Sequence, residues 1–206
     1  MSPGNARNSI TLQSLGDAVR MVTGANALQL MGHNDNGWDQ GQIMVLPNAS
    51  ILSPYGMSNK LLKATFQPTV VSSAVDPAGL TDSTELFFLA TTNKTAMNFR
   101  IANLNTSAVP LHITWKAEVK GDVGNPGGDT DRAEVRCFTG ETARVQVLGA
   151  DSLDAVNTPA QPNRVGIADG APLAVVVGGV SGSLQYVAPK LSVTVITVEV
   201  GECVQT

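Results

Sequence analysis

The sequence holds little of what several common functions require. Only two of its 206 residues are cysteine and two are histidine, aromatic residues make up 4% and charged residues 15%. Two cysteines are too few for a disulfide scaffold, and with two histidines they make a poor zinc site. So few aromatic rings, with no evident stripe, weaken the case for a sugar-binding platform. Hydrophobic residues, at 43%, instead suit a globular chain.

Basic clusters and long apolar runs are also missing. The formal net charge is -4, so the chain lacks the electrostatic footprint of a nucleic-acid-binding protein, and an anionic membrane surface is disfavoured. The longest apolar runs, such as residues 171–177, are far shorter than the roughly 20 residues of a membrane span. No apolar run follows a positive start at the N-terminus, so we expect no secretory signal in this chain.

The two cysteines, Cys137 and Cys203, both fall near predicted strands. The sequence allows either one bridge between them in an extracellular context or two separate thiols. Three N-x-S/T sequons begin at Asn48, Asn93 and Asn105. They add little support for a secreted protein, because short sequons arise by chance in a chain rich in Ser, Thr and Asn.

The first 64 residues carry helical patterns around one short apolar strand. Ser9 or Thr11 is expected to cap the first helix and Gly24 to end it. Residues 27–31 predict a buried strand, and residues 54–64 predict a second helix. One strand cannot make a sheet, so this region looks like a piece of an α/β layer. The apolar residues that define the first helix recur at spacings of three and four: Leu12, Leu15, Ala18, Val19 and Val22.

From residue 65 onward the apolar period changes to two and turn residues become frequent. Many short strands between Gly, Pro, Asp and Asn turns predict a mainly β chain with an antiparallel, jelly-roll-like β-sandwich over residues 65–206. In the last predicted strand both alternating faces carry apolar groups, which indicates a central position. The predicted strands are residues 69–75, 85–91, 97–103, 111–119, 133–138, 144–148, 173–177, 183–187 and 192–200.

Two loops carry a resemblance to one enzyme family. The segment 148–165 resembles the loop between the last strands of the C-terminal β-sandwich of family 51 α-L-arabinofuranosidases. Residues 14–22, 28–31 and the loop Asn34-Asp35-Asn36 with Trp38 resemble the end of the barrel in the plant and fungal branch of that family. Residues 43–47 and 55–62 resemble the next segment of those enzymes, including the final barrel helix. The matching positions of the first loop are Leu153, Asp154, Asn157, Thr158, Pro159, Pro162, Asn163 and Val165.

The resemblance covers about residues 9–200 and implies the end of a (β/α)8 barrel, residues 1–64, followed by the sandwich. Enzymes of this family are glycoside hydrolases that remove terminal α-L-arabinofuranosyl groups with retention, using two carboxyl groups roughly 5 Å apart. The family places both on barrel strands upstream of the matched region, so no residue here inherits a catalytic role. We therefore expect this chain alone to be non-catalytic and to use no cofactor or metal. The family implies a secreted, extracellular location.

A candidate binding loop lies where barrel enzymes build their sites, at the carboxyl end of a strand. If the barrel is completed, Trp38 is placed to stack on a sugar, and His33, Asn34 and Asp35 to bond its hydroxyls. The alternative is a solvated turn with Trp38 packed locally. The other polar candidates have structural interpretations. Asp151, Asp154 and Asn157 are expected to cap turns, His112 to be a face residue, and five glutamates to lie on solvated faces: Glu85, Glu118, Glu134, Glu141 and Glu199.

One barrel strand and two amphipathic helices leave an apolar face uncovered, and such faces mark partner sites. We therefore expect residues 1–64 to dock on another protein chain, with the molecule acting as a structural subunit. One alternative is a split or processed α-L-arabinofuranosidase whose catalytic barrel lies elsewhere. Another is a carbohydrate-binding β-sandwich, for which arabinose-containing polysaccharide is the implied partner. A viral jelly-roll coat protein fits the β-rich composition but does not explain the two family-like loops.

Overall fold

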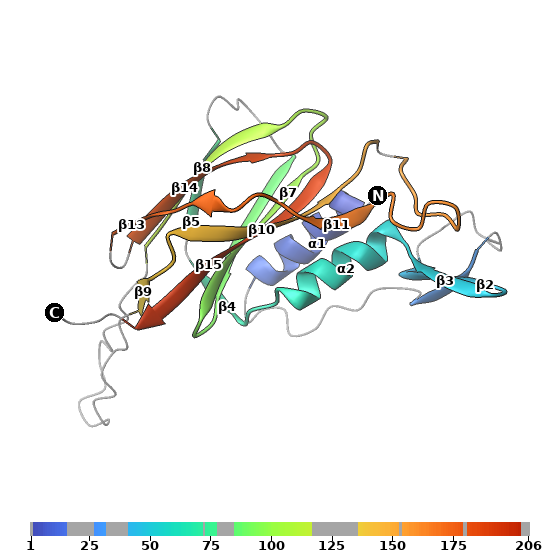
Figure 1. Cartoon of the computed structure of the whole chain (residues 1–206), viewed down its shortest axis with the longest axis horizontal. Coiled ribbons are helices and arrows are strands. Elements are labelled where there is room, and N and C mark those ends of the chain that lie inside the picture. Colours follow the sequence, from blue (N-terminus) through green and yellow to red (C-terminus); the bar gives the residue numbers. More distant parts are fainter. Residues whose placement is uncertain are drawn as a thin grey trace, which may run out of the picture.

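The fold is that of a mainly β protein, as predicted, and its two packed sheets carry two helices and a small third sheet (Figure 1). The order of elements runs from a helix and a small three-stranded sheet, through a second helix, into the strands of the sandwich. The computed structural model describes residues 2–15, 27–31, 41–71, 73–77, 85–116, 136–152, 154–178 and 181–202.

The larger sheet of the sandwich has the strand order β11-β10-β15-β7-β6-β4, with β12 beside β10 and β9 beside β15. All of its paired strands run antiparallel. The strands are β4 (Thr69–Val71), β6 (Leu86–Thr92), β7 (Ala96–Asn103), β9 (Arg136–Phe138), β10 (Thr142–Gly149), β11 (Gly166–Asp169), β12 (Leu173–Ala174) and β15 (Ser192–Glu202).

The smaller sheet of the sandwich has the order β13-β14-β8-β5 and is also antiparallel. Its strand β8 alternates strictly between buried and exposed residues, so one face meets the larger sheet and the other meets solvent. His112 lies on the exposed face, which confirms that it is a face residue. The strands are β5 (Ser73–Pro77), β8 (Val109–Lys116), β13 (Val176–Gly178) and β14 (Ser181–Ala188).

An aromatic row fills the core between the two sheets. The Phe99 ring on β7 lies 4.9 Å from the Trp115 ring on β8, and Trp115 meets Phe138 edge-on at 5.4 Å. Phe88 stacks on Phe99 at 5.9 Å. Gly182 on β14 faces Trp115, and a Cβ there would overlap the indole ring. Four of the nine aromatic residues of the chain therefore join the layers of the sandwich.

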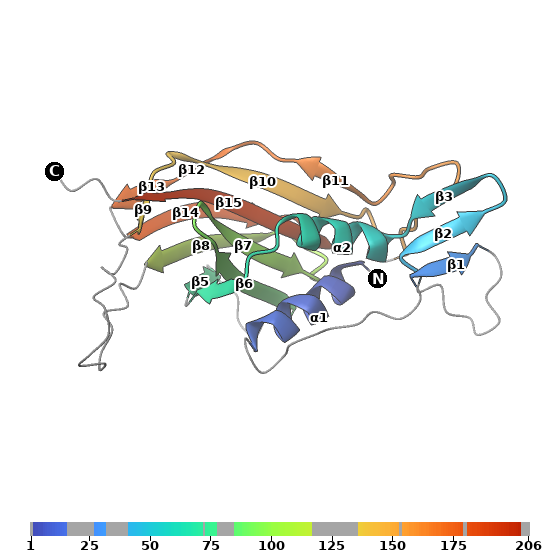
Figure 2. The same cartoon turned by 90° about the horizontal axis from the view of Figure 1, so that it is seen from below.

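The helices cover the outer face of the larger sheet, away from the smaller one (Figure 2). They are α1 (Ser2–Ser14) and α2 (Pro54–Ala64). Their apolar residues Ile10 and Leu61 form a second core with Val193 and Val195 of β15. The expectation that the apolar faces of both helices are uncovered is therefore wrong for these residues, because the larger sheet covers them. The other face of β15 packs into the sandwich core through Ile196 and Val198. Because both of its faces are covered, β15 is a central strand, as predicted.

Helix α2 has the bounds that the sequence predicts. The Ser53 side chain caps it by accepting a hydrogen bond from the Gly56 amide at 3.1 Å, and Pro54 occupies the first turn, where no amide proton is needed. The helix ends at Thr65, whose amide bonds back to Leu61. Within the described residues, neither helix has the length and apolar character that crossing a bilayer demands.

Helix α1 differs from its prediction. A start at Ser9 or Thr11 is wrong, because the helix already runs from Ser2, with Pro3 in a first turn where its missing amide breaks no helical bond. The predicted stop at Gly24 lies outside the described residues. The predicted start was wrong because several polar residues of this segment are equally suited to cap a helix, so the sequence does not indicate which one precedes it.

The small sheet has the order β1-β2-β3 and was only partly foreseen. Strand β1 (Leu28–Leu30) lies within the predicted strand 27–31 and pairs in parallel with β2 (Ile43–Leu46). Its predicted burial is wrong, because β1 lies at the edge of this sheet with Leu28 and Leu30 exposed. Strand β2 then forms an antiparallel hairpin with β3 (Ala49–Leu52). The division of the chain at residue 65 stays a prediction.

Two predicted strands are in fact each split between the sheets. The predicted strand 69–75 divides into β4, which pairs with β6 in the larger sheet, and β5, which pairs with β8 in the smaller one. The predicted strand 173–177 divides into β12 and β13 in the same way, with Val175 buried at the crossing. A strand that crosses between layers keeps an apolar pattern throughout, so the sequence pattern predicts a single element.

Candidate functional site

The loop predicted to face sugar lies outside the described residues. Its members His33, Asn34, Asp35 and Trp38 follow the carboxyl end of β1 in the sequence. Their proposed role in sugar contact stays a prediction.

The loop that resembles the arabinofuranosidase sandwich is held together by Asn157. Its buried side-chain amide donates to the Leu52 carbonyl at 2.9 Å and to the Val165 carbonyl at 3.0 Å, and its oxygen accepts from the Val165 amide at 2.7 Å. Asn157 thus ties the loop to the end of β3, directly before α2. A structural role for Asn157 is confirmed, but the residue joins two segments and does not cap a nearby turn as predicted.

The carboxylates of the same loop are also structural or exposed. Both oxygens of Asp151 accept from the Arg164 guanidinium at 3.1 Å. The hydrogen bond from Arg164 is the main reason that the pKa of Asp151 lies below its ordinary value. Asp154 is exposed. Among the described residues, no cluster of His, Cys, Asp and Glu has the arrangement of a metal site.

The described glutamates lie where the sequence predicts. Glu85, Glu141 and Glu199 are all exposed, while Glu118 and Glu134 lie outside the described residues. Cys137 is disulfide-bonded. Cys203, the other cysteine of the sequence, lies outside the described residues.

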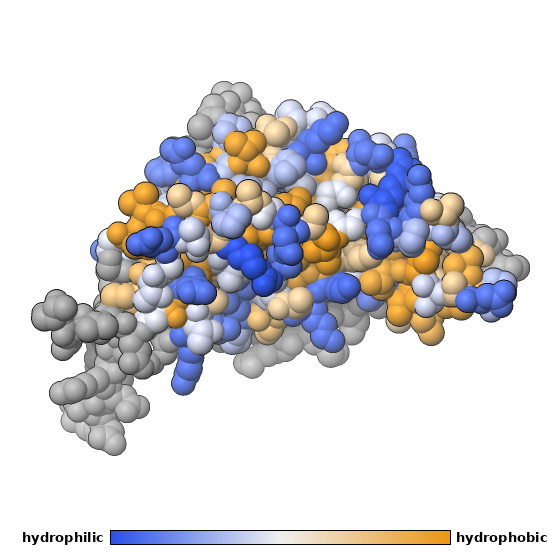
Figure 3. Space-filling view, viewed as in Figure 1, coloured by the Kyte–Doolittle hydropathy of each residue, from blue (hydrophilic) through white to orange (hydrophobic). Residues whose placement is uncertain are grey.

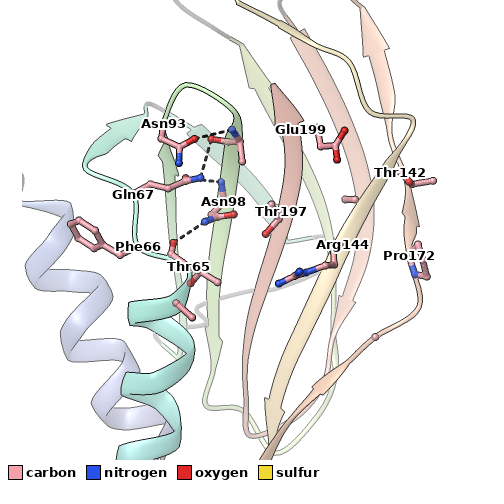
Figure 4. Close-up of a pocket in the computed structure, with 14 residues that line it drawn as sticks. Thr65, Phe66, Gln67, Asn93, Asn98, Thr142, Arg144, Pro172, Thr197 and Glu199 are labelled. Atoms are coloured by element: carbon pink, nitrogen blue, oxygen red, sulfur yellow. Dashed lines mark hydrogen bonds between the residues drawn. The ribbon is translucent and has the colours of Figure 1, made fainter. Parts of the chain in front are cut away.

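A polar hollow, here called the α2-end pocket, opens on the outer face of the larger sheet just beyond the last turn of α2 (Figure 4). Its volume is about 450 Å³. The floor is formed by β7, β15 and β10, and the segment after α2 makes one wall. The residues that line the hollow are Ala64, Thr65, Phe66, Gln67, Asn93, Ala96, Asn98, Thr142, Ala143, Arg144, Gly170, Pro172, Thr197 and Glu199.

Gln67 and its partners build the wall of this pocket. The Gln67 side-chain oxygen accepts from the Thr91 hydroxyl at 3.2 Å and from the backbone N–H of Asn98 at 3.1 Å. Its side-chain nitrogen donates to the Ala96 carbonyl at 2.9 Å. Gln67 is buried with each of its polar atoms bonded, so it fixes the segment after α2 against the sheet.

Arg100 lies under the wall as a buried cation. Its guanidinium donates to the carbonyls of Thr65 at 2.5 Å and Leu62 at 3.2 Å, and to the side-chain oxygen of Gln13 on α1. Burial lowers the pKa of Arg100 to about 10. The carbonyls at the end of α2 carry the negative end of the helix dipole, so they suit a positive partner. Arg100 joins both helices to β7.

Asn98 has one bonded and one unbonded polar atom at the inner end of the floor. Its nitrogen donates to the Thr65 carbonyl at 2.7 Å. Its buried oxygen has no hydrogen-bond partner in the described part of the chain. Figure 4 shows this oxygen directed along the floor toward Thr197. A buried acceptor without a donor is uncommon and calls for a partner.

Sequence reasoning missed Asn98, Arg100, Arg144 and Thr197 as members of one cluster. One sequence feature could have indicated the cluster: the two polar residues Asn98 and Arg100 lie within the otherwise apolar strand β7. The grouping with Arg144 and Thr197 depends on strand register, which the sequence does not reveal.

Comparison with known proteins finds a likeness in fold. No family model matches the chain, and no curated protein matches its sequence. The arabinose-bound MgGH51 α-L-arabinofuranosidase matches with a TM-score of 0.68 and 23% identity, over 98% of this chain and 27% of that one. The α-L-arabinofuranosidase of Thermotoga maritima, in complex with arabinose, matches with a TM-score of 0.64 and 14% identity, over 96% of this chain and 38% of that one.

A family 51 α-L-arabinofuranosidase from Bifidobacterium longum matches with a TM-score of 0.56 and 14% identity. Here the alignment covers 96% of this chain and 34% of the other. This chain therefore has the fold of a part of these enzymes, and it spans well under half the length of each.

Proposed function

We propose that this chain is a non-catalytic C-terminal portion of an α-L-arabinofuranosidase-like protein, and that it docks through residues 1–64 on another chain as a structural subunit. The fold likeness to part of these enzymes supports the first half of the proposal. The resemblance of residues 14–22, 28–31 and 34–38 supports the plant and fungal branch. The observation that carries the second half is the open edge of β1.

The backbone of β1 bonds to β2 on one side only. The Met31 amide donates to the Val45 carbonyl at 3.0 Å, and the Ile43 amide donates to the Ala27 carbonyl at 2.9 Å. In a parallel pair, alternate residues direct their backbone groups to the same neighbour. The amides and carbonyls of Leu28 and Leu30 therefore face away from β2, where no described strand pairs with them. Such an edge is ready to accept a further strand.

The same sheet carries an apolar face. Leu28 is 65% exposed and Leu30 is 57% exposed. Leu28 pairs with Ile43, Ile43 with Leu52, and Leu30 with Val45, so these side chains share one face. Figure 3 shows apolar residues gathered at the end of the molecule where Figure 1 places β2 and β3. Parallel sheets are normally covered on both faces, so this region favours a partner that supplies a strand and a helix.

A second candidate function is that of a split or processed α-L-arabinofuranosidase, in which the docked chain supplies the catalytic barrel and arabinofuranosyl polysaccharide is the substrate. The likeness in fold to enzymes solved with arabinose favours this interpretation over an unrelated assembly. A third, the carbohydrate-binding sandwich, is favoured by the polar α2-end pocket.

The test of the proposal is the native mass of the chain isolated from its source, by light scattering, with the accompanying chains identified. We expect a complex larger than the 21.4 kDa of one chain, which is lost in the double variant Leu28→Lys/Leu30→Lys. The control is Val187→Lys, which places a lysine at an equally exposed valine, 57%, on the smaller sheet.

A monomer at working concentrations, or a complex that survives the double variant, would remove the docking proposal. Hydrolysis of an aryl arabinofuranoside by the intact complex, but not by this chain, would establish the split enzyme. A complex without that activity would leave the structural subunit.

A further inference from the structure

The floor of the α2-end pocket is a row of polar side chains that crosses three strands. Asn98 on β7 pairs with Thr197 on β15, and Thr197 pairs with Arg144 on β10. Paired residues share one face of a sheet, so an amide, a hydroxyl and a guanidinium lie side by side. Figure 4 shows the Arg144 side chain extending across the floor toward Thr197.

Two of these groups hold hydrogen-bonding capacity toward the hollow. The Asn98 oxygen at the inner end is a buried acceptor without a donor among the described residues. Arg144 uses one nitrogen to donate to Gln146 at 2.8 Å, which holds the guanidinium in place and leaves further donors. A ligand that donates a hydrogen bond to the Asn98 oxygen and accepts one from the Arg144 guanidinium would pair both groups.

The charges that line the α2-end pocket indicate which class of ligand it binds. Arg144 is the one cation that lines the pocket and Glu199 the one anion among the described residues, so an anionic ligand gains no net attraction. A single carboxylate is too few oxygen ligands for a cation such as calcium. An apolar ligand would leave Asn98 and Thr197 without partners. The ligand that suits this lining is therefore a neutral molecule with many hydroxyl groups.

We propose that the α2-end pocket binds a neutral saccharide, held by the row Asn98–Thr197–Arg144 and flanked by Glu199. The volume of about 450 Å³ falls in the range of small-ligand sites. Phe66 at the rim is 61% exposed, but Figure 4 shows its ring directed away from the floor. Hydrogen bonds rather than stacking therefore carry recognition, and the dissociation constant is on the order of millimolar.

This inference is independent of the docking proposal. The α2-end pocket lies just beyond the C-terminus of α2, whereas the sheet β1-β2-β3 lies before its N-terminus. Leu28→Lys/Leu30→Lys therefore leaves saccharide binding unchanged, while changes in the pocket leave the complex intact. The native mass tests the docking proposal and the NMR titration tests the saccharide proposal, so either one can fail while the other stands.

The test is a heteronuclear NMR titration of the full chain with L-arabinose, D-xylose and D-glucose, each to roughly 50 mM, which nearly saturates a site of millimolar affinity. L-arabinose is included because two solved neighbours hold arabinose. We expect at least one sugar to shift the amide signals of Asn98, Arg144 and Thr197. Arg144→Ala and Thr197→Val should each weaken that binding about tenfold, because each removes one hydrogen-bonding group.

The matched controls are Lys116→Ala and Thr114→Val, two exposed positions on β8 in the other sheet. Both should leave the affinity unchanged. Thermal unfolding of each variant checks that the fold is intact. The proposal is overturned if none of the three sugars shifts these amides, if the shifts survive both pocket variants, or if D-galacturonic acid binds more tightly than the neutral sugars.

Discussion

The guanidinium of Arg100 donates to the carbonyl of Thr65 across 2.5 Å, joining the middle of the larger sheet to the end of α2. Asn98 donates to the same carbonyl at 2.7 Å. One backbone oxygen thus receives two side chains from β7, and the wall of the α2-end pocket begins at that point. The helix is held on the sheet by polar contacts at its end as well as by its apolar face.

Replacing Arg100 tests this attachment. Arg100→Met keeps much of the volume but leaves the Leu62 and Thr65 carbonyls with fewer donors in a buried place. We expect the free energy of unfolding to fall by about 2–3 kcal/mol, measured by urea denaturation. The control Arg144→Met, at an exposed position, should change it by less than about 0.5 kcal/mol. Equal stability of the two variants would show that the burial cost of the Arg100 charge offsets its bonds.

Removing the Asn157 side chain should loosen the family-like loop. Asn157→Ala leaves the buried amide and carbonyl of Val165 and the carbonyl of Leu52 without their bonds. We expect a loss of about 2–4 kcal/mol in the free energy of unfolding. Native-state hydrogen exchange should show faster exchange at the Val165 amide. Asn163→Ala, at an exposed position of the same loop, is the control, and similar losses from both variants would contradict this assignment.

The pKa of Asp151 should respond to its partner. In the folded chain this pKa is depressed, mainly by the hydrogen bond from Arg164, so the folded state binds fewer protons than the unfolded state near the ordinary value of 3.8. Its contribution to stability is therefore present above that pH and is lost as the pH falls through the folded value. Arg164→Ala should raise the pKa of Asp151 in a carbon-13 NMR titration, and an unchanged Asp151 titration would contradict the assigned pairing.

The cysteines make a prediction that mass spectrometry can check. Cys137 is disulfide-bonded, and Cys203 is the only other cysteine in the chain. We expect no alkylation of the unreduced chain and two alkylated thiols after reduction. Loss of the bridge in Cys137→Ala/Cys203→Ala should lower the free energy of unfolding by about 2–4 kcal/mol. Two alkylated thiols before reduction would contradict the bridge.

The sequence predicted correctly those helices and strands whose features depend on residues close together in the chain. Helix α2 was predicted because Pro54 in its first turn and the spacing of its apolar residues agree, and β15 because both of its faces are apolar. The layer crossings between β4 and β5 and between β12 and β13 were missed, because a strand keeps its pattern when it changes sheets. The α2-end pocket was also missed, since Asn98, Arg144 and Thr197 meet only through register over long sequence separations.

The position of β15 has a consequence for how the molecule is made. It is the last strand described, yet it lies between β10 and β7, in the middle of the larger sheet. The sheet therefore has a gap at its centre until β15 has been synthesised and released from the ribosome. Until then β10 and β7 lack the strand that joins them, so the central pairing of the larger sheet depends on contacts between segments far apart in the sequence, which slows folding.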